Sequence, residues 1–329
     1  MSETPKVPII GGGPAGMSCA LWLHNYGLGP LIIEQEGALG GMAGRNPYPN
    51  PWLLGRPGAL ERDNAAEFAR HIDEIKVETW LGGRPRRAFR RPDGLIGIDV
   101  AFSDERPPQS LSSFVMVIAT GTEFRGTEWL DEVGDGRALA ERGRVHIGPA
   151  WAAEPSAAAG AHVAVIGGGD NAFDVANILL GKGIKVSILM RSEQPRAQKL
   201  LVDRVRAHAA AGLAEVRAKQ EVVALEEKGT AVQVHLNDGS HLEVDHILLL
   251  LGYRPNAREP WLSDLPLETD ARGYFIVDGN METSCWGVFA VGDVANPVHP
   301  CTATAIASGT MAAREIQKRL TRHGAMTPR

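Results

Sequence analysis

Residues 7–16 read VPIIGGGPAG, and this stretch decides the fold. A short apolar strand runs into glycines at positions 11, 13 and 16, and a helix-forming segment follows. Gly11 permits a tight turn, Gly13 lets a pyrophosphate approach the backbone, and Gly16 lets the helix pack closely on the strand. The helix presents free N–H groups and its positive dipole end to the phosphates. The stretch therefore predicts a dinucleotide site at the start of a doubly wound α/β domain.

Three further features belong to this first site. Glu34 stands at the C-terminal end of the next predicted strand, 31–33. A carboxylate at this position can accept hydrogen bonds from both ribose hydroxyls. Gly40-Gly41-Met42 is expected to carry the chain past the nucleotide toward an isoalloxazine, within an irregular segment over 37–57. Asp293 follows an apolar strand and precedes the last helix, a position from which it can bind a ribityl hydroxyl. Pro8 is unusual in a central strand, so we expect it at a position that donates no ladder hydrogen bond.

A second fingerprint begins at residue 163, where the chain reads VAVIGGGDNA. Its third glycine is replaced by Ala172, which nicotinamide-binding versions allow. After the next strand, 186–189, no carboxylate follows; Arg191, Ser192 and Arg196 are available to a 2′-phosphate instead. The pattern favours NADPH, with NADH as the alternative if the two arginines are only solvated loop charges.

Composition narrows the class of protein. The chain has 329 residues and a net charge of −5, with a pI near 6.1, which argues against a general nucleic-acid binder. No apolar stretch approaches the length of a membrane span, and the first strand begins too early to leave room for a signal peptide. Three cysteines, Cys19, Cys285 and Cys301, are odd in number and far apart, which suits a reducing cytoplasm. We expect no metal site and no membrane partner.

The motifs together resemble the low-molecular-weight thioredoxin reductase family of two-domain flavoproteins. The resemblance covers nearly the whole chain and is carried by residues 11–16, Glu34, 119–121, 167–172, 252–256 and 291–293. It implies an α/β fold with two Rossmann-like dinucleotide-binding domains. An FAD-binding domain, 1–122 and 254–329, would be split by an inserted NAD(P)H-binding domain, 123–253. It also implies tightly bound FAD, a homodimer, and rotation of one domain against the other during turnover.

The fingerprints and the resemblance together give a set of candidate cofactor residues. For FAD these are Gly11, Gly13, Pro14, Ala15, Gly16, Glu34, Gly41, Met42, Ala119, Thr120, Gly121, Gly292, Asp293, Thr302, Ala303 and Thr304. The family places the helix N–H groups of the last three against the flavin pyrimidine edge. For NAD(P)H they are Gly167, Gly169, Asp170, Asn171, Ala172, Arg191, Ser192 and Arg196. Two of the three arginines in the family's 2′-phosphate motif, Arg191 and Arg196, remain.

The redox pair of that family is absent from this sequence. Thioredoxin reductases carry Cys-x-x-Cys shortly before the second fingerprint, whereas residues 145–153 here read VHIGPAWAA. No thiol is available there to pass reducing equivalents from flavin to a disulfide. Reduction of thioredoxin by the usual route is therefore not expected.

Relatives without the pair include the thioredoxin-reductase-type ferredoxin/flavodoxin–NADP reductases, which exchange electrons directly with a protein carrier. Residues 84–91 read RPRRAFRR, so Arg84–Arg91 is a basic segment able to steer an acidic ferredoxin or flavodoxin; otherwise it is a solvated hairpin face. Those reductases extend further past the last helix than this chain does, so His299, Trp52 or Tyr48 are candidates to lie near the flavin instead.

Two other classes of function stay open. One is a flavin-dependent reductase or oxidase of small molecules such as quinones, dithiols or O₂, with Cys301 as a candidate reactive thiol. The other is a non-catalytic flavin redox sensor. No side-chain acid, base or nucleophile stands out, so the catalytic residue is unknown; the cofactors carry the chemistry and the protein supplies orientation and electrostatics.

Overall fold

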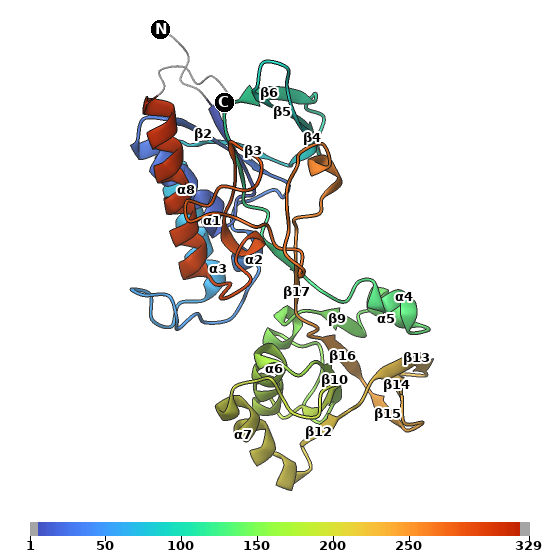
Figure 1. Cartoon of the computed structure of the whole chain (residues 1–329). Coiled ribbons are helices and arrows are strands. Elements are labelled where there is room, and N and C mark those ends of the chain that lie inside the picture. Colours follow the sequence, from blue (N-terminus) through green and yellow to red (C-terminus); the bar gives the residue numbers. More distant parts are fainter. Residues whose placement is uncertain (1–5, 323–329) are drawn as a thin grey trace. The chain divides into compact units, whose positions relative to one another are not determined.

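The computed structural model describes residues 6–322, and the chain divides into two compact units. Unit 1 comprises Met1–Glu123 and Arg254–Arg329, and unit 2 comprises Phe124–Tyr253. The chain passes from one unit to the other through β8 (Thr122–Phe124) and returns through β17 (Tyr253–Pro255); these strands pair as a two-stranded sheet. The α/β fold with parallel sheets that the sequence predicts is confirmed (Figure 1).

Unit 1 is built on a five-stranded parallel sheet in the order β18-β7-β1-β2-β3. Its elements in chain order are β1 (Lys6–Ile10), α1 (Pro14–Asn25), β2 (Gly29–Glu34), α2 (Gly41–Gly44), α3 (Glu61–Glu74), β3 (Glu78–Leu81), β4 (Gly83–Arg90), β5 (Ile96–Phe102), β6 (Gln109–Ser113), β7 (Met116–Ile118), η3 (Pro260–Leu262), β18 (Val288–Ala290), η4 (Gly292–Val294) and α8 (Thr302–Arg322). The predicted irregular segment 37–57 thus contains one short helix, α2.

Strand alternation gives this sheet two apolar faces. Val7 and Ile9 of β1 pack into a core with α1, α3 and α8, whereas Ile10 faces the opposite core, formed with β4 and β5. Helices therefore cover one face, and the antiparallel sheet β4-β5-β6 covers the other (Figure 1). Burial on both faces explains why these strands are apolar throughout.

Pro8 lies in the middle of β1 without breaking it. Gly11 N–H donates to Ile33 O, so the N–H groups that alternate with it point toward β2 and the nitrogen of Pro8 points toward β7. Pairing of β1 with β7 begins only at Ile9, opposite Val117. Pro8 therefore occupies a non-donating position, as expected from the sequence.

Unit 2 repeats this plan. Its parallel sheet has the order β12-β11-β10-β16-β9. The elements are α4 (Trp129–Glu132), α5 (Gly136–Glu141), β9 (Val145–Ile147), η1 (Ala150–Ala153), β10 (His162–Ile166), α6 (Asp170–Gly181), β11 (Lys185–Met190), α7 (Lys199–Ala207), η2 (Ala209–Ala211), β12 (Ala214–Ala218), β13 (Val222–Lys228), β14 (Ala231–Leu236), β15 (His241–Val244) and β16 (His246–Leu249). Val163 and Val165 of β10 pack with α6 and α7, while Ala164 and Ile166 face the antiparallel sheet β13-β14-β15.

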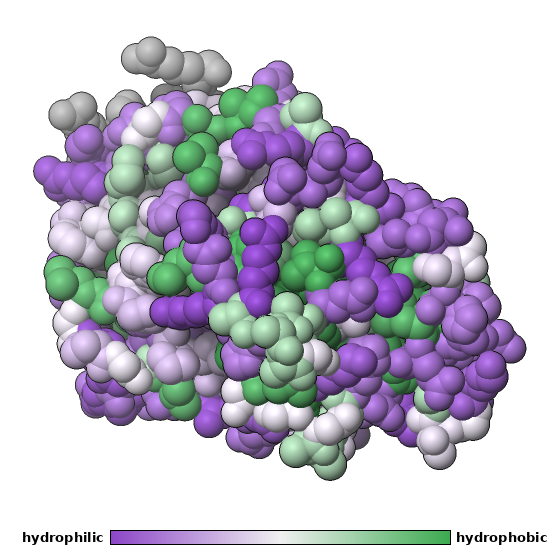
Figure 2. All heavy atoms as spheres, turned by 90° about the horizontal axis from the view of Figure 1, so that it is seen from below, coloured by the Kyte–Doolittle hydropathy of each residue, from purple (hydrophilic) through white to green (hydrophobic). Residues whose placement is uncertain are grey.

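The surface carries few large apolar side chains. Figure 2 shows apolar side chains in small groups among polar ones on one face. The most exposed are Trp52, Leu54 and Val298, each more than four-fifths accessible. Among the described residues, no helix is long and apolar enough to cross a membrane.

Candidate functional site

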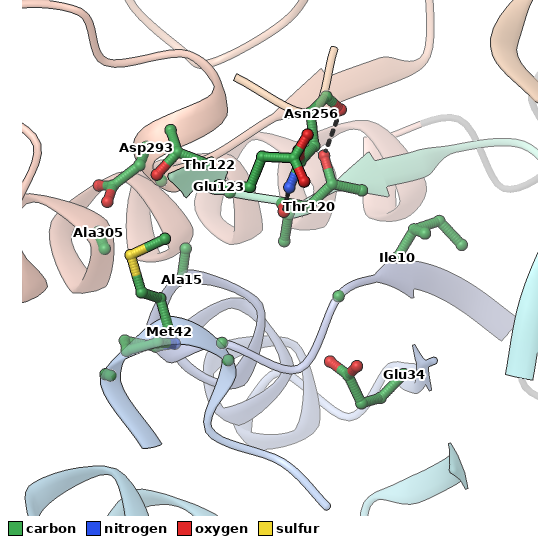
Figure 3. A pocket seen from close by; sticks show the side chains of 18 of the residues that line it. Ile10, Ala15, Glu34, Met42, Thr120, Thr122, Glu123, Asn256, Asp293 and Ala305 are labelled. Carbon is green, nitrogen blue, oxygen red and sulfur yellow. Dashed lines mark hydrogen bonds between the residues drawn. The ribbon is translucent and has the colours of Figure 1, made fainter. Parts of the chain in front are cut away.

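A cavity of about 520 Å³ lies in unit 1 where β1, β2 and β7 end. It is lined by residues at the ends of all three strands, including Gly11, Glu34 and Thr120, and by residues at the start of α8 (Figure 3). The carboxyl ends of parallel strands, beside a switch in strand order, are where doubly wound folds bind nucleotides.

The glycines of residues 11–16 have distinct physical roles. Gly11 has φ +111°, and a Cβ there would lie 2.3 Å from the carbonyl oxygen of Ala119. At Gly16, a Cβ would lie 2.0 Å from the carbonyl oxygen of Gly11. At Gly13, by contrast, a Cβ meets nothing within 4 Å, although the residue lines the cavity. Gly11 and Gly16 thus permit the close packing, while Gly13 leaves open space at the N-terminus of α1 for another molecule.

Glu34 marks one end of the cavity (Figure 3). It is buried, with 6% of its surface exposed. Its Oε2 accepts a hydrogen bond from Gly12 N–H at 2.7 Å, and its Oε1 accepts one from Glu36 N–H at 2.9 Å. These bonds fix the carboxylate and leave each oxygen a further lone pair for hydroxyl donors.

Asp293 marks the other end, in η4, and faces the cavity with Met42 and Ala305 (Figure 3). Its Oδ1 is buried without a hydrogen-bond partner among the described residues. Burial raises the pKa of this carboxyl above its ordinary value, because nothing compensates the lost hydration. An orphaned buried oxygen is costly, so a ligand hydroxyl fits this position. Together with the open space at Gly13, this fits a group that has phosphates and hydroxyls, as FAD does.

Two peptide segments far apart in the sequence close the cavity wall. Thr120 Oγ1 donates to Asn256 O, and Asn256 Nδ2 donates to Thr120 O, both at 2.9 Å. Figure 3 shows Thr122 and Glu123 on the same wall. The sequence prediction named Ala119, Thr120 and Gly121 but not Asn256, although Asn256 ends the motif 252–256.

One of the three residues predicted at the start of α8 lines the cavity. Thr302 lines the cavity, together with Cys301 and Ala305, but Ala303 and Thr304 are not among its lining residues. Thr304 Oγ1 instead donates to the carbonyls of His299 and Cys301 at 2.9 and 3.0 Å. These bonds tie the first turn of α8 to the loop before it.

The alternative candidates to lie near the flavin were Tyr48, Trp52 and His299. None of the three is among the described residues that line the cavity, and Trp52 and His299 are exposed. Glu61 and Asn46 do line it and were not foreseen. The only sequence signal for Glu61 was its position at the start of a predicted helix. Acidic residues are common there, so the signal does not single out a site residue.

The second fingerprint reproduces the glycine geometry of the first within unit 2. Gly167 has φ +152°, and a Cβ there would lie 2.4 Å from Leu250 O. At Gly169 a Cβ meets nothing within 4 Å. Ala172 is fully buried against this turn. Gly169 thus leaves open space at the N-terminus of α6, as Gly13 does at the N-terminus of α1.

The side chains of Asp170 and Asn171 bind neighbouring elements of unit 2. Asp170 Oδ1 accepts from Gln198 N–H at 2.7 Å, which fixes the start of α7. Asn171 Nδ2 donates to the hydroxyl of Tyr253 at 2.8 Å. What these two residues can offer a nucleotide directly is therefore their backbone N–H groups.

The predicted 2′-phosphate residues lie beside the second glycine turn. Arg196 N–H donates to Gly168 O at 2.8 Å, so the loop folds back over the turn. Ser192 Oγ donates to Gln194 O at 2.8 Å. The side chains of Arg191 and Arg196 are exposed and have no ion pair within residues 6–321. The one acidic side chain of the loop, Glu193, is paired with Lys219 at 3.0 Å.

An aromatic stack occupies the segment where the resemblance places a disulfide. Trp151 of η1 stacks on His146 with ring centroids 4.5 Å apart, and His146 Nε2 lies 3.2 Å from His246 Nδ1. Burial and the neighbouring imidazole lower the pKa of His146 to about 4. All three cysteines are free; Cys19 and Cys285 are buried in unit 1, and Cys301 lies on the cavity wall.

The basic segment Arg84–Arg91 forms β4 and the turn after it. Three of its five arginines have local partners: Arg87 pairs with Asp264, Arg91 pairs with Asp93, and Arg90 donates to Gly94 O and Trp286 O. Arg84 and Arg86 are exposed and have no ion pair within residues 6–321. Gly83 and Pro85 of the same strand line the cavity.

Comparison with known proteins gives the family. The family described as pyridine nucleotide-disulphide oxidoreductase matches residues 5–315. A ferredoxin–NADP reductase of Ignicoccus hospitalis is 30% identical, covering 87% of this chain and 88% of its own length. A thioredoxin reductase of Rickettsia felis is 27% identical, covering 97% of this chain and 99% of its own length. The thioredoxin reductase structure of Lactococcus lactis superposes with a TM-score of 0.79 at 24% identity, covering 97% of this chain and 99% of that one.

The chain belongs to the pyridine nucleotide-disulphide oxidoreductase family, because the match covers nearly all of it. It is an oxidoreductase enzyme that uses FAD and NAD(P)H, as the sequence predicted, and the interpretation as a non-catalytic sensor is wrong.

Proposed function

We propose that this member of the family passes electrons from NADPH through FAD to a one-electron protein carrier, a ferredoxin or flavodoxin, without a catalytic disulfide. One observation carries the proposal. Unit 2 contains no cysteine, and Trp151 and His146 fill the segment where the thioredoxin-reducing pair would lie. The name of the Ignicoccus relative supports the same acceptor class.

The cavity of unit 1 is the proposed FAD site. Glu34 would bind the ribose of the adenosine at one end, and the N-terminus of α1 behind Gly13 would bind the pyrophosphate. Asp293 would accept a ribityl hydroxyl, and Thr302 would lie at the isoalloxazine end. Bound FAD supplies the chemistry, since it accepts a hydride equivalent from nicotinamide and releases the electrons to the carrier.

The glycine turn of unit 2 is the proposed NADPH site. The N-terminus of α6 behind Gly169 would bind the pyrophosphate, and Arg191 and Arg196 would pair with the 2′-phosphate. Both guanidinium groups are exposed and have no ion pair within residues 6–321, so they can reach a ligand without breaking an existing ion pair. We therefore favour NADPH over NADH.

The basic strand β4 is the proposed steering surface for an acidic carrier. The charges available for this purpose are Arg84 and Arg86. A Cβ at Gly83 would lie 3.1 Å from Cγ2 of Ile33, the residue before Glu34, so β4 would run along the adenosine end of the proposed FAD site. It would raise the association rate rather than form the contact through which electrons pass. A homodimer and a cytoplasmic location, consistent with three free cysteines, complete the proposal.

A steady-state assay with a panel of acceptors tests this function. The purified holoenzyme is supplied with NADPH or NADH and with ferredoxin, flavodoxin, thioredoxin, a quinone or O₂. We expect rapid turnover with ferredoxin or flavodoxin, a preference for NADPH, and no reduction of thioredoxin. Fast turnover with quinone or O₂ and none with either carrier would replace it with a small-molecule reductase or oxidase.

A further inference from the structure

Glu61 is a buried carboxylate in the wall of the unit 1 cavity. It is the first residue of α3, has 4% of its surface exposed, and lines the cavity with Thr302 and Asp293. No feature of the family fingerprint led to it. A buried carboxylate at this end of the cavity needs partners that compensate its lost hydration.

Neutral donors surround this carboxylate. Oε2 accepts from Asn50 Nδ2 at 2.6 Å and from Asn64 Nδ2 at 3.4 Å, and Oε1 accepts from the hydroxyl of Thr302. Asn64 is itself buried, and its Oδ1 accepts from Arg56 Nε at 3.2 Å. Asn64 therefore links Arg56 to Glu61, and Glu61 itself has no ion pair within residues 6–321.

Helix ends compensate the charge instead of a counter-ion. Glu61 lies in the first turn of α3, a helix of 14 residues, and bonds Thr302, the first residue of α8, a helix of 21 residues. Each helix N-terminus carries roughly half a positive charge, which stabilises a nearby anion. Three accepted hydrogen bonds and the two helix ends thus take the place of the water that burial removes from the carboxylate.

We propose that Glu61 is a positioning residue for the flavin: it holds the first residue of α8 at the cavity, and its charge offsets the positive end of that helix. The inference rests on the proposed FAD site. A helix N-terminus favours the negative charge that a flavin gains on reduction. Glu61 opposes this effect, so the bound flavin is a stronger reductant, which suits a carrier of low potential such as ferredoxin.

The charge and the hydrogen bond can be separated by mutation. In Glu61→Gln the amide oxygen can accept from both asparagines, while the amide NH₂ donates to the Thr302 hydroxyl, which can also act as an acceptor. The network survives and the charge is lost. In Thr302→Val the charge survives and the bond is lost. Glu67→Gln, an exposed carboxylate on the same helix, is the matched control.

The readouts are the flavin midpoint potential, measured against reference dyes, and the dissociation constant of FAD on reconstitution of the apoprotein. Glu61→Gln is expected to raise the equilibrium constant of flavin reduction at least tenfold, about 30 mV for a two-electron couple. Thr302→Val is expected to weaken FAD binding about fivefold, as loss of one hydrogen bond does, and to move the potential less. Glu67→Gln should change neither.

An unmoved potential in Glu61→Gln, or unchanged FAD binding in Thr302→Val, overturns the inference. If Glu61→Gln does not fold, the FAD affinity of Thr302→Val still decides whether the contact with α8 matters. Wild-type protein that binds no FAD would refute the proposed cofactor site itself, which is a distinguishable outcome.

Discussion

The two glycine turns have the same backbone geometry but different surroundings. In unit 1 the turn opens into a cavity with a buried Glu34 at one end. At the other end lies an oxygen of Asp293 that has no hydrogen-bond partner among residues 6–321. In unit 2 the charged residues beside the turn, Arg191 and Arg196, are exposed. Buried groups without internal partners favour a ligand that stays, whereas exposed charges favour one that exchanges. This difference fits the proposed assignment of a resident cofactor to unit 1 and a diffusible cosubstrate to unit 2.

The largest effect is expected from glycines that the folded chain itself needs. In Gly16→Ala the new Cβ would lie 2.0 Å from Gly11 O, so the turn must shift and FAD should be lost along with several kcal/mol of stability. In Gly13→Ala the Cβ meets no protein atom within 4 Å, so the apoprotein should stay folded while FAD binds about a hundredfold more weakly, roughly 2.7 kcal/mol. Flavin absorbance and thermal unfolding separate the two variants. Unchanged FAD affinity in Gly13→Ala would mean that Gly13 does not face the cofactor.

Asp293 should matter next, and in a pH-dependent way. Asp293→Ala is expected to cost about 1.5–3 kcal/mol of FAD binding, roughly 10- to 100-fold, because a bond to a charged group is lost. In the apoprotein burial raises the pKa of Asp293, so its contribution to stability is fully present at low pH and is lost as the pH rises through the raised pKa.

Urea unfolding of the apoprotein from about pH 4 to 8 measures this effect. The wild type should lose stability relative to Asp293→Asn as the pH rises, and FAD should remove most of the difference. Parallel pH profiles for the two apoproteins would show that the carboxyl is solvated, contrary to its burial.

A smaller effect is expected at the second turn. The double variant Arg191→Ala/Arg196→Ala should raise the KM for NADPH about tenfold and leave that for NADH unchanged, because only NADPH carries the 2′-phosphate. Lys228→Ala, on β13 of the same unit, is a control for the loss of positive charge. An equal rise of KM for both nucleotides would point to the pyrophosphate instead.

The smallest effect is expected at β4. Arg84→Glu/Arg86→Glu should slow association with an acidic carrier by a few-fold at low salt, and the difference should vanish at high salt because screening removes the attraction. Lys228→Glu, a charge reversal on β13 in the other unit, is the control for a reversal away from β4. A salt-independent loss, measured by stopped flow, would mean that β4 is a direct contact surface.

The sequence predicted the parallel α/β fold because glycine turns after apolar strands are local signals. It predicted two Rossmann-like domains but did not reveal that an antiparallel sheet covers one face of each parallel sheet. The pairing of Asn256 with Thr120 and the burial of Glu61 beside Thr302 also remained hidden, since these contacts join distant segments. Ala303 and Thr304 were assigned by resemblance, which gives the position of a helix start but not which of its residues face the cavity.

Anaerobic titration of the holoenzyme with dithionite counts the electrons that the enzyme accepts. We expect full reduction of the flavin at two electrons per FAD with no further uptake, and the same reduced spectrum when NADPH is added to the oxidised enzyme. Uptake of four electrons per FAD, with the appearance of two reactive thiols, would reveal a redox-active disulfide and refute direct electron transfer from FAD to the carrier.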